Sequence, residues 1–444
     1  MGNDTDVSCR TILWGIEMAK TRKILVISHF GVSGELCKRF LMEGNQVKYF
    51  IKDKNSKDIN DGLIAKVKSW EPHVEWADLI IFDDANFGKQ ADMLREMDKA
   101  VVGPCPYSDK LEMDRDFGQD EMEKAGMTVL PHWAFTSFDE AIDFVQATPG
   151  RYVLKPNGIA QDEKCLTYVG KSEDGSDAIA MLENYKKKWA TKIKSIHIQQ
   201  FSKGVEVAIG AWFNGKEFIL PACINFEYKK MMNGDVGPST GEMGTSCLWS
   251  HESKLYDETL AKMVPALRAS GYSGYMDINC IATKEAIWPL EFTPRFGVPT
   301  IWLQMEGIKS KLGDFFEALG TGSKFRLETE SGVQICVVVA VSPYPFEDPA
   351  AFDKYSKDKE VEFKDPELSG IYLADIKLVD GKFVLAGNSG YACVCVGCGM
   401  TFEEAKEEVY KRVKSVSLPD MFYRTDIGHK WNKDRDLLGS WGWL

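Results

Sequence analysis

The sequence has no apolar run approaching the length of a membrane span, and its acidic start lacks the basic-then-apolar order of a signal peptide. It also lacks an excess of positive charge, since 66 Asp and Glu residues against 54 Lys and Arg residues give a net charge of −12. Binding to a phosphate backbone needs clustered Lys and Arg, so we expect no nucleic-acid polymer as a partner. These absences predict a soluble, cytoplasmic protein that does not bind membranes and is a monomer or dimer.

Cysteines are present, but without the spacing of a metal site. The eleven cysteines are scattered through apolar, strand-like runs, which is typical of free thiols in a reducing cytosol. The one dense cluster, 393–398, has no matching Cys or His pair nearby. Alternation along a strand places Cys393 and Cys395 on one face as small apolar residues. We favour a core role for them over a metal or iron–sulfur site.

The length and composition allow several domains. With 444 residues, 44% of them hydrophobic, the chain can bury a large core and divide into about two to four domains. Met18 resembles an alternative start, so residues 1–17 are predicted to be a poorly ordered extension. Strands are predicted at 23–28, 46–51, 78–82 and 100–104, with a helix from Glu35; this order indicates a parallel α/β sheet. The 29–34 turn only loosely resembles a dinucleotide fingerprint, so a nicotinamide or flavin site is not expected.

The middle of the chain is predicted to contain both helices and strands, and the end to be rich in strands. We predict one helix over 108–125 with Ser108 as its N-cap, and a hairpin that turns at Asn214 and Gly215. Residues 235–244 are too rich in glycine for a regular element, and predict a loop whose amides approach a ligand. From Gly332 onward, several strands and a helix that begins with a capping box at Thr401 predict a separate, smaller α+β domain.

One predicted hairpin, 274–297, carries two acidic residues. If Ile281 faces Ile287 across its turn, Asp277 lies directly opposite Glu291. Facing carboxylates destabilise a sheet unless a cation neutralises them, and such pairs hold magnesium beside nucleotide phosphates. The alternative is an exposed hairpin whose two acids face water.

The order of motifs resembles that of the ATP-grasp ligases, most closely the phosphoribosylamine–glycine ligase family. The residues that carry the resemblance are Gly103-Pro104, the 108–125 helix, Val153–Lys155, Gln199–Phe201, Gly204–Glu206, Glu227–Lys230, Gly237–Gly244, Leu290–Gly297 and Met421–Gly428. The resemblance implies an N-terminal α/β domain at 18–103, an ATP-grasp domain at 104–330 with a mobile lid near 127–202, and a C-terminal domain at 331–444. It also implies ATP and Mg²⁺ as cofactors, a glycine-like amino acid and an amine acceptor as substrates, and an amide made through an acyl phosphate.

The resemblance further implies roles for individual residues. Lys155 and Arg295 are the expected catalytic residues, and Asp277 and Glu291 the expected metal ligands. The nucleotide would contact Arg115, Lys155, Gln199, Gln200, Phe201, Glu206 and Lys229; the other substrates would contact Glu227, Gly237, Pro238, Ser239, Thr240 and Gly241. Each residue also has an ordinary structural alternative, such as a surface lysine or the partner of a structural acid.

Three stretches depart from the family pattern. The turn Ser28–Glu35 lacks the family's arginine, the 157–164 lid loses glycines and gains Asp162 and Glu163, and Thr293 replaces an asparagine metal ligand. Val298 and Thr300 stand where the family has acids. The ATP site is therefore expected to be kept and the acceptor site rebuilt. The alternatives are a ligase that joins a small amino acid to a different amine and a non-catalytic nucleotide-binding relative. If phosphoribosylamine is still the acceptor, Arg295, Arg424 or Lys229 could supply the missing phosphate contact.

Overall fold

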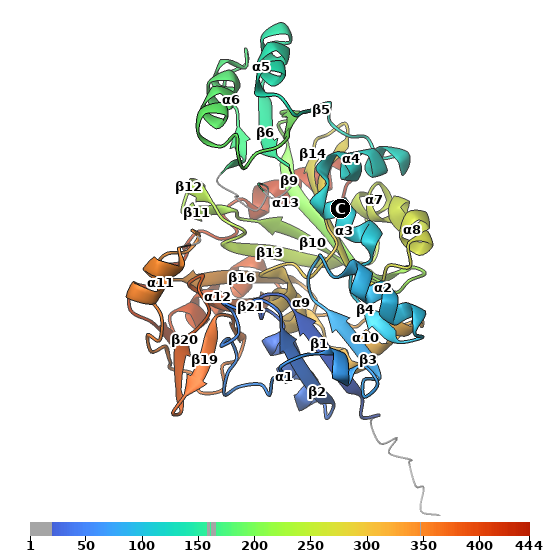
Figure 1. The fold of residues 1–444 in the computed structure, drawn as a ribbon, viewed down its shortest axis with the longest axis vertical. Coiled ribbons are helices and arrows are strands. Elements are labelled where there is room, and N and C mark those ends of the chain that lie inside the picture. Colours follow the sequence, from blue (N-terminus) through green and yellow to red (C-terminus); the bar gives the residue numbers. More distant parts are fainter. Residues whose placement is uncertain (1–19, 158–159, 161–165, 347) are drawn as a thin grey trace, which may run out of the picture.

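The computed structural model describes residues 20–157, 160, 166–346 and 348–444 (Figure 1). The predicted extension 1–17 and the predicted lid acids Asp162 and Glu163 lie outside these residues. Within the described ranges, no helix is both long enough and apolar enough to cross a membrane.

The N-terminal part is a parallel α/β unit, as predicted. Its elements are β1 (Lys23–Ser28), α1 (Gly34–Met42), β2 (Gln46–Ile51), the 3₁₀ turn η1 (Glu71–His73), β3 (Leu79–Phe82), α2 (Gly88–Glu96) and β4 (Ala100–Val102). The strands run parallel in the order β2-β1-β3-β4. β1 and β3 are apolar runs buried on both faces, which is typical of parallel strands covered by helices. The loops after β1 and β3 therefore emerge together at one edge of the sheet.

The single helix predicted over 108–125 is two helices, α3 (Pro106–Met113) and α4 (Arg115–Lys124). Asp114 separates them because its backbone is extended and its side chain accepts a hydrogen bond from the Phe117 N–H, which makes it the N-cap of α4. The predicted cap Ser108 is instead inside α3, whose N-cap is Cys105. Arg115 thus begins a helix rather than lying in the interior of one.

A small unit stands apart at one end of the molecule (Figure 1). It contains β5 (His132–Phe135), α5 (Phe138–Ala147), β6 (Tyr152–Pro156), β7 (Tyr168–Val169), α6 (Ser176–Lys188) and β8 (Ile196–Gln200). Its strands form a sheet in the order β5-β8-β6-β7. The unit has its own apolar core, centred on Leu154, Leu182 and Ile198. It occupies the place of the predicted lid, whose boundaries and motion remain predictions.

An eight-stranded sheet forms the centre of the molecule, in the order β15-β14-β9-β10-β13-β16-β21-β18. The elements of its first part are β9 (Val205–Phe213), β10 (Phe218–Glu227), β11 (Lys230–Met232), β12 (Val236–Ser239), β13 (Gly244–Ser250), α7 (Lys254–Asp257), α8 (Leu260–Ala269), β14 (Gly274–Ala282), β15 (Ile287–Thr293), α9 (Thr300–Gly307) and α10 (Leu312–Thr321). The predicted β9–β10 hairpin is present, with residues 214–217 between the strands. Apolar side chains cover both faces of the sheet, for example Ile209 on one and Trp212 on the other.

The register predicted for the β14–β15 hairpin was wrong. Ile281 pairs with Trp288, a shift in register follows between Asn279 and Cys280, and Asp277 lies opposite Thr293. The residue opposite Glu291 is Asn279. A bulge of this kind adds one residue to one strand and cannot be read from alternation alone. Asp277 and Asn279 are two positions apart on β14 and so lie on the same face. Asp277 and Glu291 are therefore on one face as diagonal neighbours.

The prediction that 235–244 holds no regular element was also wrong. Residues 236–239 form β12, which pairs antiparallel with β11. Gly237 has φ +87° and Asp235 φ +57°, so the turn into this ribbon uses left-handed backbone that favours glycine and tolerates aspartate. The irregular part is limited to residues 240–243, before β13.

Three strands of the C-terminal part, β16, β21 and β18, belong to the central eight-stranded sheet. Its elements are β16 (Val333–Ala340), α11 (Pro349–Tyr355), β17 (Glu362–Phe363), β18 (Ile371–Leu373), β19 (Ile376–Val379), β20 (Lys382–Leu385), β21 (Tyr391–Gly399), α12 (Phe402–Val413), β22 (Val416–Ser417) and α13 (Trp431–Trp441). β16 pairs with β13, so the central sheet continues through the predicted boundary near 330. Cys393 and Cys395 are buried on one face among apolar residues, as predicted.

Candidate functional site

The predicted phosphate-binding lysine is buried at the base of the small unit. Lys155, on β6, is only 9% exposed, and its Nζ donates to Gln199 Oε1 on β8 at 3.0 Å. Burial lowers the pKa of Lys155 to about 8; the charge of Glu291 opposes this shift, and Arg115 and Lys229 add to it. With Glu206, which also acts on Lys155, four predicted site residues from distant parts of the chain lie within electrostatic reach of its ammonium group.

Arg115 and Glu291 form a short ion pair. Arg115 Nη1 lies 2.7 Å from Glu291 Oε2, which joins the first residue of α4 to β15. Glu291 therefore has a protein partner, which the sequence did not suggest. If Glu291 holds a metal ion and Arg115 a phosphate, the two must share or exchange these contacts when nucleotide binds.

Lys229 connects two further predicted residues. Its Nζ lies 3.2 Å from Glu206 Oε1 and 3.1 Å from Glu227 Oε2. Burial lowers the pKa of Lys229, but the charges of Glu227 and Glu206 outweigh burial and raise it well above its ordinary value. Lys229 is thus a permanent cation between the predicted ribose-binding and substrate-binding acids.

Asp277 is buried and held in one orientation. Tyr275 Oη donates to its Oδ2 at 2.8 Å, and Asn225 Nδ2 donates to the same oxygen at 3.0 Å. Its other oxygen, Oδ1, has no hydrogen-bond partner. Burial raises the pKa of Asp277 to about 7, and the neighbouring Glu227 adds to this shift. Both the buried, unpartnered oxygen and the raised pKa are features that a bound cation would remove.

The oxygens on this face suit a hard cation such as Mg²⁺. Besides Asp277 Oδ1, the amide oxygen of Asn279 is buried without a partner, directly opposite Glu291 in the hairpin. Oxygen ligands of this kind are preferred by Mg²⁺, which keeps several waters and usually binds substrate phosphates as well. Asp277, Asn279 and Glu291 would hold the ion. Among the described residues, no three His, Cys, Asp or Glu side chains are gathered for a metal, so phosphate and water oxygens would complete its shell.

Arg295 lies where the central sheet meets the N-terminal unit. Its Nε is 3.1 Å from Glu112 Oε1 and 3.6 Å from Asp84 Oδ1, and its Nη1 donates to the Phe296 carbonyl. Burial lowers the pKa of Arg295, but Glu112 and Asp84 reverse this and raise it. The alternative that Arg295 pairs with structural acids is therefore observed, and its predicted contact with a phosphoryl group remains a prediction.

The predicted adenine segment, 199–201, joins the small unit to β9. The backbone N–H of Gln200 donates to the Pro131 carbonyl at 2.9 Å, and that of Phe201 donates to the Arg151 carbonyl at 2.9 Å. The guanidinium of Arg151 stacks on the Phe201 ring at 3.5 Å. These two N–H groups are already used, so a base could not receive a hydrogen bond from either of them without displacing a partner.

The predicted substrate loop is held by hydrogen bonds at Ser239 and Thr240. Thr240 donates to the Lys229 carbonyl through its N–H and its hydroxyl, and Lys230 Nζ donates to Ser239 Oγ at 2.9 Å. Gly241 has open space where a Cβ would stand. Pro238 lies in β12 after Gly237. Thr240 therefore lies beside the backbone of Lys229.

In the turn after β1, which was predicted to be the rebuilt acceptor site, two backbone N–H groups already have protein acceptors. The His29 N–H donates to Asp83 Oδ1 at 3.0 Å, and the Gly31 N–H donates to Ser28 Oγ at 2.9 Å. Glu35 was expected to repel a phosphate at this turn, but it is buried and accepts from the Leu373 N–H at 3.4 Å instead. Asp84 also lies at this turn, 3.7 Å from His29 Nδ1.

Arg424 is not available for a ligand. It is fully buried and pairs with Asp235 at 3.0 Å and Asp426 at 2.8 Å, and its Nη1 also donates to the Lys230 carbonyl. It ties the C-terminal segment to the β11–β12 ribbon. The suggestion that Arg424 contacts a substrate phosphate was wrong.

Sequence reasoning missed several polar residues of this region. Asn225, Tyr275, Asn279 and Glu242 line the buried face around Asp277, while Asp84 and Glu112 hold Arg295. Asn279 could have been found, because it shares the strand alternation of Asp277. Glu242 stands alone in a glycine-rich segment and carries no such signal.

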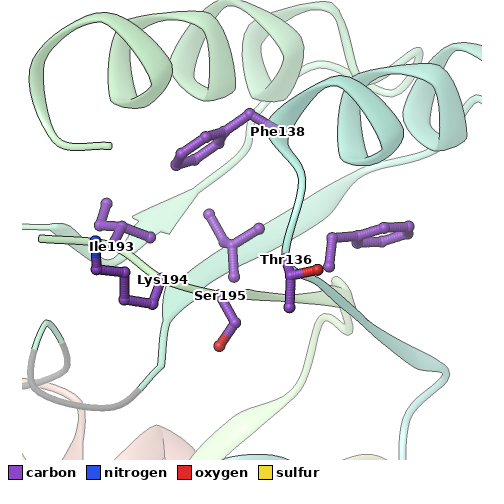
Figure 2. Close-up of a pocket in the computed structure, with 7 residues that line it drawn as sticks. Thr136, Phe138, Ile193, Lys194 and Ser195 are labelled. Atoms are coloured by element: carbon purple, nitrogen blue, oxygen red, sulfur yellow. The ribbon is translucent and has the colours of Figure 1, made fainter. Parts of the chain in front are cut away.

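A small pocket in the lid-like unit contains none of the predicted site residues (Figure 2). It is lined by Phe135, Thr136, Phe138, Ile193, Lys194, Ser195 and Ile196. Figure 2 shows Phe138, at the start of α5, facing the 193–195 segment. A second pocket, at the approach to the 199–201 segment, is lined by Glu123, Val129, Leu130, Pro131, His132 and Trp133. Neither contains the acids or lysines of the site described above.

Comparisons with known proteins place this geometry in a family. Residues 113–301 match the phosphoribosylglycinamide synthetase ATP-grasp (A) domain, and residues 334–430 match the C domain of the same synthetase. A phosphoribosylamine–glycine ligase of Streptococcus pneumoniae is 25% identical over 429 residues, covering 92% of this chain and 99% of its own length. One from Caldanaerobacter subterraneus is 27% identical over 337 residues, covering 74% and 78%.

Solved structures with the same fold include two further enzymes. The crystal structure of phosphoribosylamine–glycine ligase from Thermotoga maritima has a TM-score of 0.70 at 23% identity, covering 91% of this chain and 100% of that one. Biotin carboxylase from Campylobacter jejuni, solved with an ATP analogue, has a TM-score of 0.64 at 12% identity, covering 95% and 97%. At these identities the structural similarity establishes the fold.

Proposed function

Because the chain belongs to the phosphoribosylglycinamide synthetase family and is an ATP-grasp, ATP-dependent ligase, we propose that it joins the carboxylate of a small amino acid to an amine. The observation that carries the proposal is that three cations surround Glu291: Arg115 forms an ion pair with it, and Lys155 and Lys229 interact with it electrostatically. On the neighbouring strand, Asp277 has an oxygen without a hydrogen-bond partner among the described residues. Cations that face a phosphate and carboxylates that hold a metal ion are what phosphoryl transfer needs from a protein.

The chemistry follows from these groups. In the reaction of the ATP-grasp ligases, a substrate carboxylate attacks the γ-phosphate of ATP, and an amine then displaces phosphate from the acyl phosphate. Lys155 and Arg115 would hold the phosphates, while Asp277, Asn279 and Glu291 would hold Mg²⁺, which neutralises the charge that develops on the transferring group. Arg295, which stays protonated beside Glu112 and Asp84, would face the same group. The protein supplies position and fixed charge.

Release of ADP tests the proposed function. The purified protein is incubated with Mg²⁺ and ATP, with glycine or another small amino acid, and with a panel of amines that includes phosphoribosylamine. We expect ADP release that depends on both the amino acid and an amine. Nucleotide binding without ADP release under any combination would favour the second candidate, a non-catalytic nucleotide-binding relative. The charged groups at Lys155, Glu291 and Arg295, each in contact with other site residues, argue against that candidate.

The acceptor is expected to differ from phosphoribosylamine. A sugar phosphate needs an arginine or free backbone amides. The Ser28–Glu35 turn contains no arginine, and two of its amides are bonded to Asp83 and Ser28. We therefore predict that phosphoribosylamine, with glycine and ATP, is a poor substrate. A kcat/KM on the order of 10⁴ M⁻¹s⁻¹ or more would show instead that this site serves the same acceptor as the family.

A further inference from the structure

A buried carboxyl group near Asp277 forms no ion pair within the described part of the chain, although Lys229 and Arg295 lie within electrostatic reach of it. Glu242 lies in the segment between β12 and β13 and is 5% exposed. Its Oε1 has no hydrogen-bond partner, and no ion pair involves it among the residues that the structure describes. Its backbone is fixed, since its carbonyl accepts from Tyr344 Oη at 3.2 Å and the next residue, Met243, donates its N–H to the Tyr228 carbonyl. A buried carboxyl oxygen without a hydrogen-bond partner is costly, and a bound ligand could supply the missing donor.

A second unpartnered group lies in the same place. Asn225, on β10, is fully buried, and its Nδ2 donates to Asp277. Its Oδ1 has no partner. Asn225 therefore contacts Asp277, with which Glu242 and Glu227 both interact electrostatically. A neutral amide oxygen adds an acceptor to the acids and requires a donor from a ligand.

The nearby protein cations are already engaged. Lys229 pairs with Glu206 and Glu227, and Arg295 pairs with Glu112 and Asp84. Neither forms an ion pair with Glu242. The two unpartnered acceptors, Glu242 Oε1 and Asn225 Oδ1, would suit a ligand cation that donates several hydrogen bonds. An ammonium group has three such donors.

We propose that Glu242, Glu227 and Asn225 bind the ammonium group of the amino-acid substrate. The proposal rests on the proposed function and names the donor substrate as an α-amino acid recognised through its amine. Asp277, a predicted metal ligand, accepts a hydrogen bond from Asn225 and interacts electrostatically with Glu242 and Glu227, so this subsite adjoins the predicted metal site. An amino acid held by its ammonium group would therefore have its carboxylate beside the groups predicted to surround the γ-phosphate. A carboxylic acid without an amine would leave two buried acceptors, Glu242 Oε1 and Asn225 Oδ1, without a donor, which gives strong discrimination.

The test uses hydroxylamine in place of the unknown acceptor, because hydroxylamine captures acyl phosphates as hydroxamates. The full-length protein is assayed with Mg²⁺, ATP and glycine, alanine, acetate or glycolate. We expect hydroxamate from glycine or alanine and at least tenfold less from acetate and glycolate. In Glu242→Gln, the KM for the amino acid should rise at least tenfold while the KM for ATP stays within twofold. Glu285→Gln, which changes an exposed acid in the β14–β15 turn, is the matched control.

A second readout does not depend on turnover. Calorimetric titration of glycine into the protein with Mg²⁺ and ADP should show binding that Glu242→Gln weakens at least tenfold, with no fall in melting temperature. Unchanged amino-acid KM and affinity in this variant, or equal activation of acetate and glycine, would overturn the subsite and leave the ligase activity intact. Absence of hydroxamate and of ADP with every acid, in a protein that binds MgATP, would overturn the proposed function and the subsite with it.

Discussion

At the scale of single residues, a substitution at Glu291 tests whether this carboxylate acts in catalysis or only stabilises the fold. We expect Glu291→Ala to abolish ATP turnover, because a carboxylate that fixes Mg²⁺ is worth several kcal/mol in the transition state. Its ion pair with Arg115 is partly exposed, with 37% of the Glu291 side chain accessible, so stability should fall by only about 1 kcal/mol or less. ADP release and thermal unfolding measure the two effects. Full activity at ordinary Mg²⁺ concentration would contradict the metal assignment.

Lys155 offers a second residue-scale prediction. Lys155→Met keeps the stem and removes the charge, so nucleotide affinity should fall with little change in melting temperature. Because burial lowers the pKa of Lys155 to about 8, nucleotide binding above that pH must take up a proton. Affinity in the wild type should therefore decline as pH rises from about 8 to 10.

The matched control for this prediction is Lys155→Arg, which stays charged across the whole range and should remove the decline. Calorimetric affinities at several pH values make the measurement. Unchanged binding in Lys155→Met would place the lysine away from the phosphates.

At the scale of secondary-structure elements, the close contact between β9 and β14 depends on a glycine. A Cβ on Gly210 would overlap the hydroxyl of Tyr275 and meet Asp277 Oδ2 at 2.5 Å. We expect Gly210→Ala to destabilise the protein by about 1–3 kcal/mol or more, because a sheet interior cannot yield to the added methyl group. Urea unfolding measures the loss.

The double variant Gly210→Ala/Tyr275→Phe distinguishes overlap from a general loss of β structure. Removing the hydroxyl takes away the closest overlap, although the Tyr275 Cζ atom would still lie 2.3 Å from the added Cβ. The double variant should therefore lose less stability than the sum of the two single variants. Additive losses in the two changes would contradict the steric explanation.

Elements set by local pattern could be predicted from the sequence, and elements set by single side chains could not. β1 matches its predicted bounds because its apolar run has no competing signal. The break at Asp114 depends on whether its carboxylate caps α4, and the register of β14–β15 depends on a bulge at Asn279. The order of motifs in the sequence was enough to predict Lys155 and Glu291 as site residues. Glu242 could be identified only from its burial in the structure.

At the scale of the whole molecule, buried acids make stability depend on pH. Burial raises the pKa values of Asp83 and Asp375 to about 7 each, from an ordinary value of 3.8. Between about pH 4 and 7 the folded state therefore binds more protons than the unfolded state, and stability falls as pH rises through this window. For a shift of this size, each group contributes at most about 4 kcal/mol.

Asp83→Asn tests this dependence without removing the hydrogen bond from the His29 N–H, which an amide oxygen can accept. We expect the free energy of unfolding in the variant to fall less between pH 5 and 8 than in the wild type. Denaturant unfolding at each pH makes the comparison. Parallel pH profiles would show that Asp83 ionises normally in the folded protein.

The continuity of the central sheet from β15 to β18 determines which parts of the chain can unfold locally. Because β13 and β16 share backbone hydrogen bonds, the strands on either side of residue 330 should exchange amide protons as one cooperative block. The β5–β8 sheet, with its own core, can open without disturbing that block. Slow exchange from β9 through β21, with faster exchange in β5–β8, would reveal two foldons whose boundaries follow hydrogen bonding rather than the order of the domains along the chain.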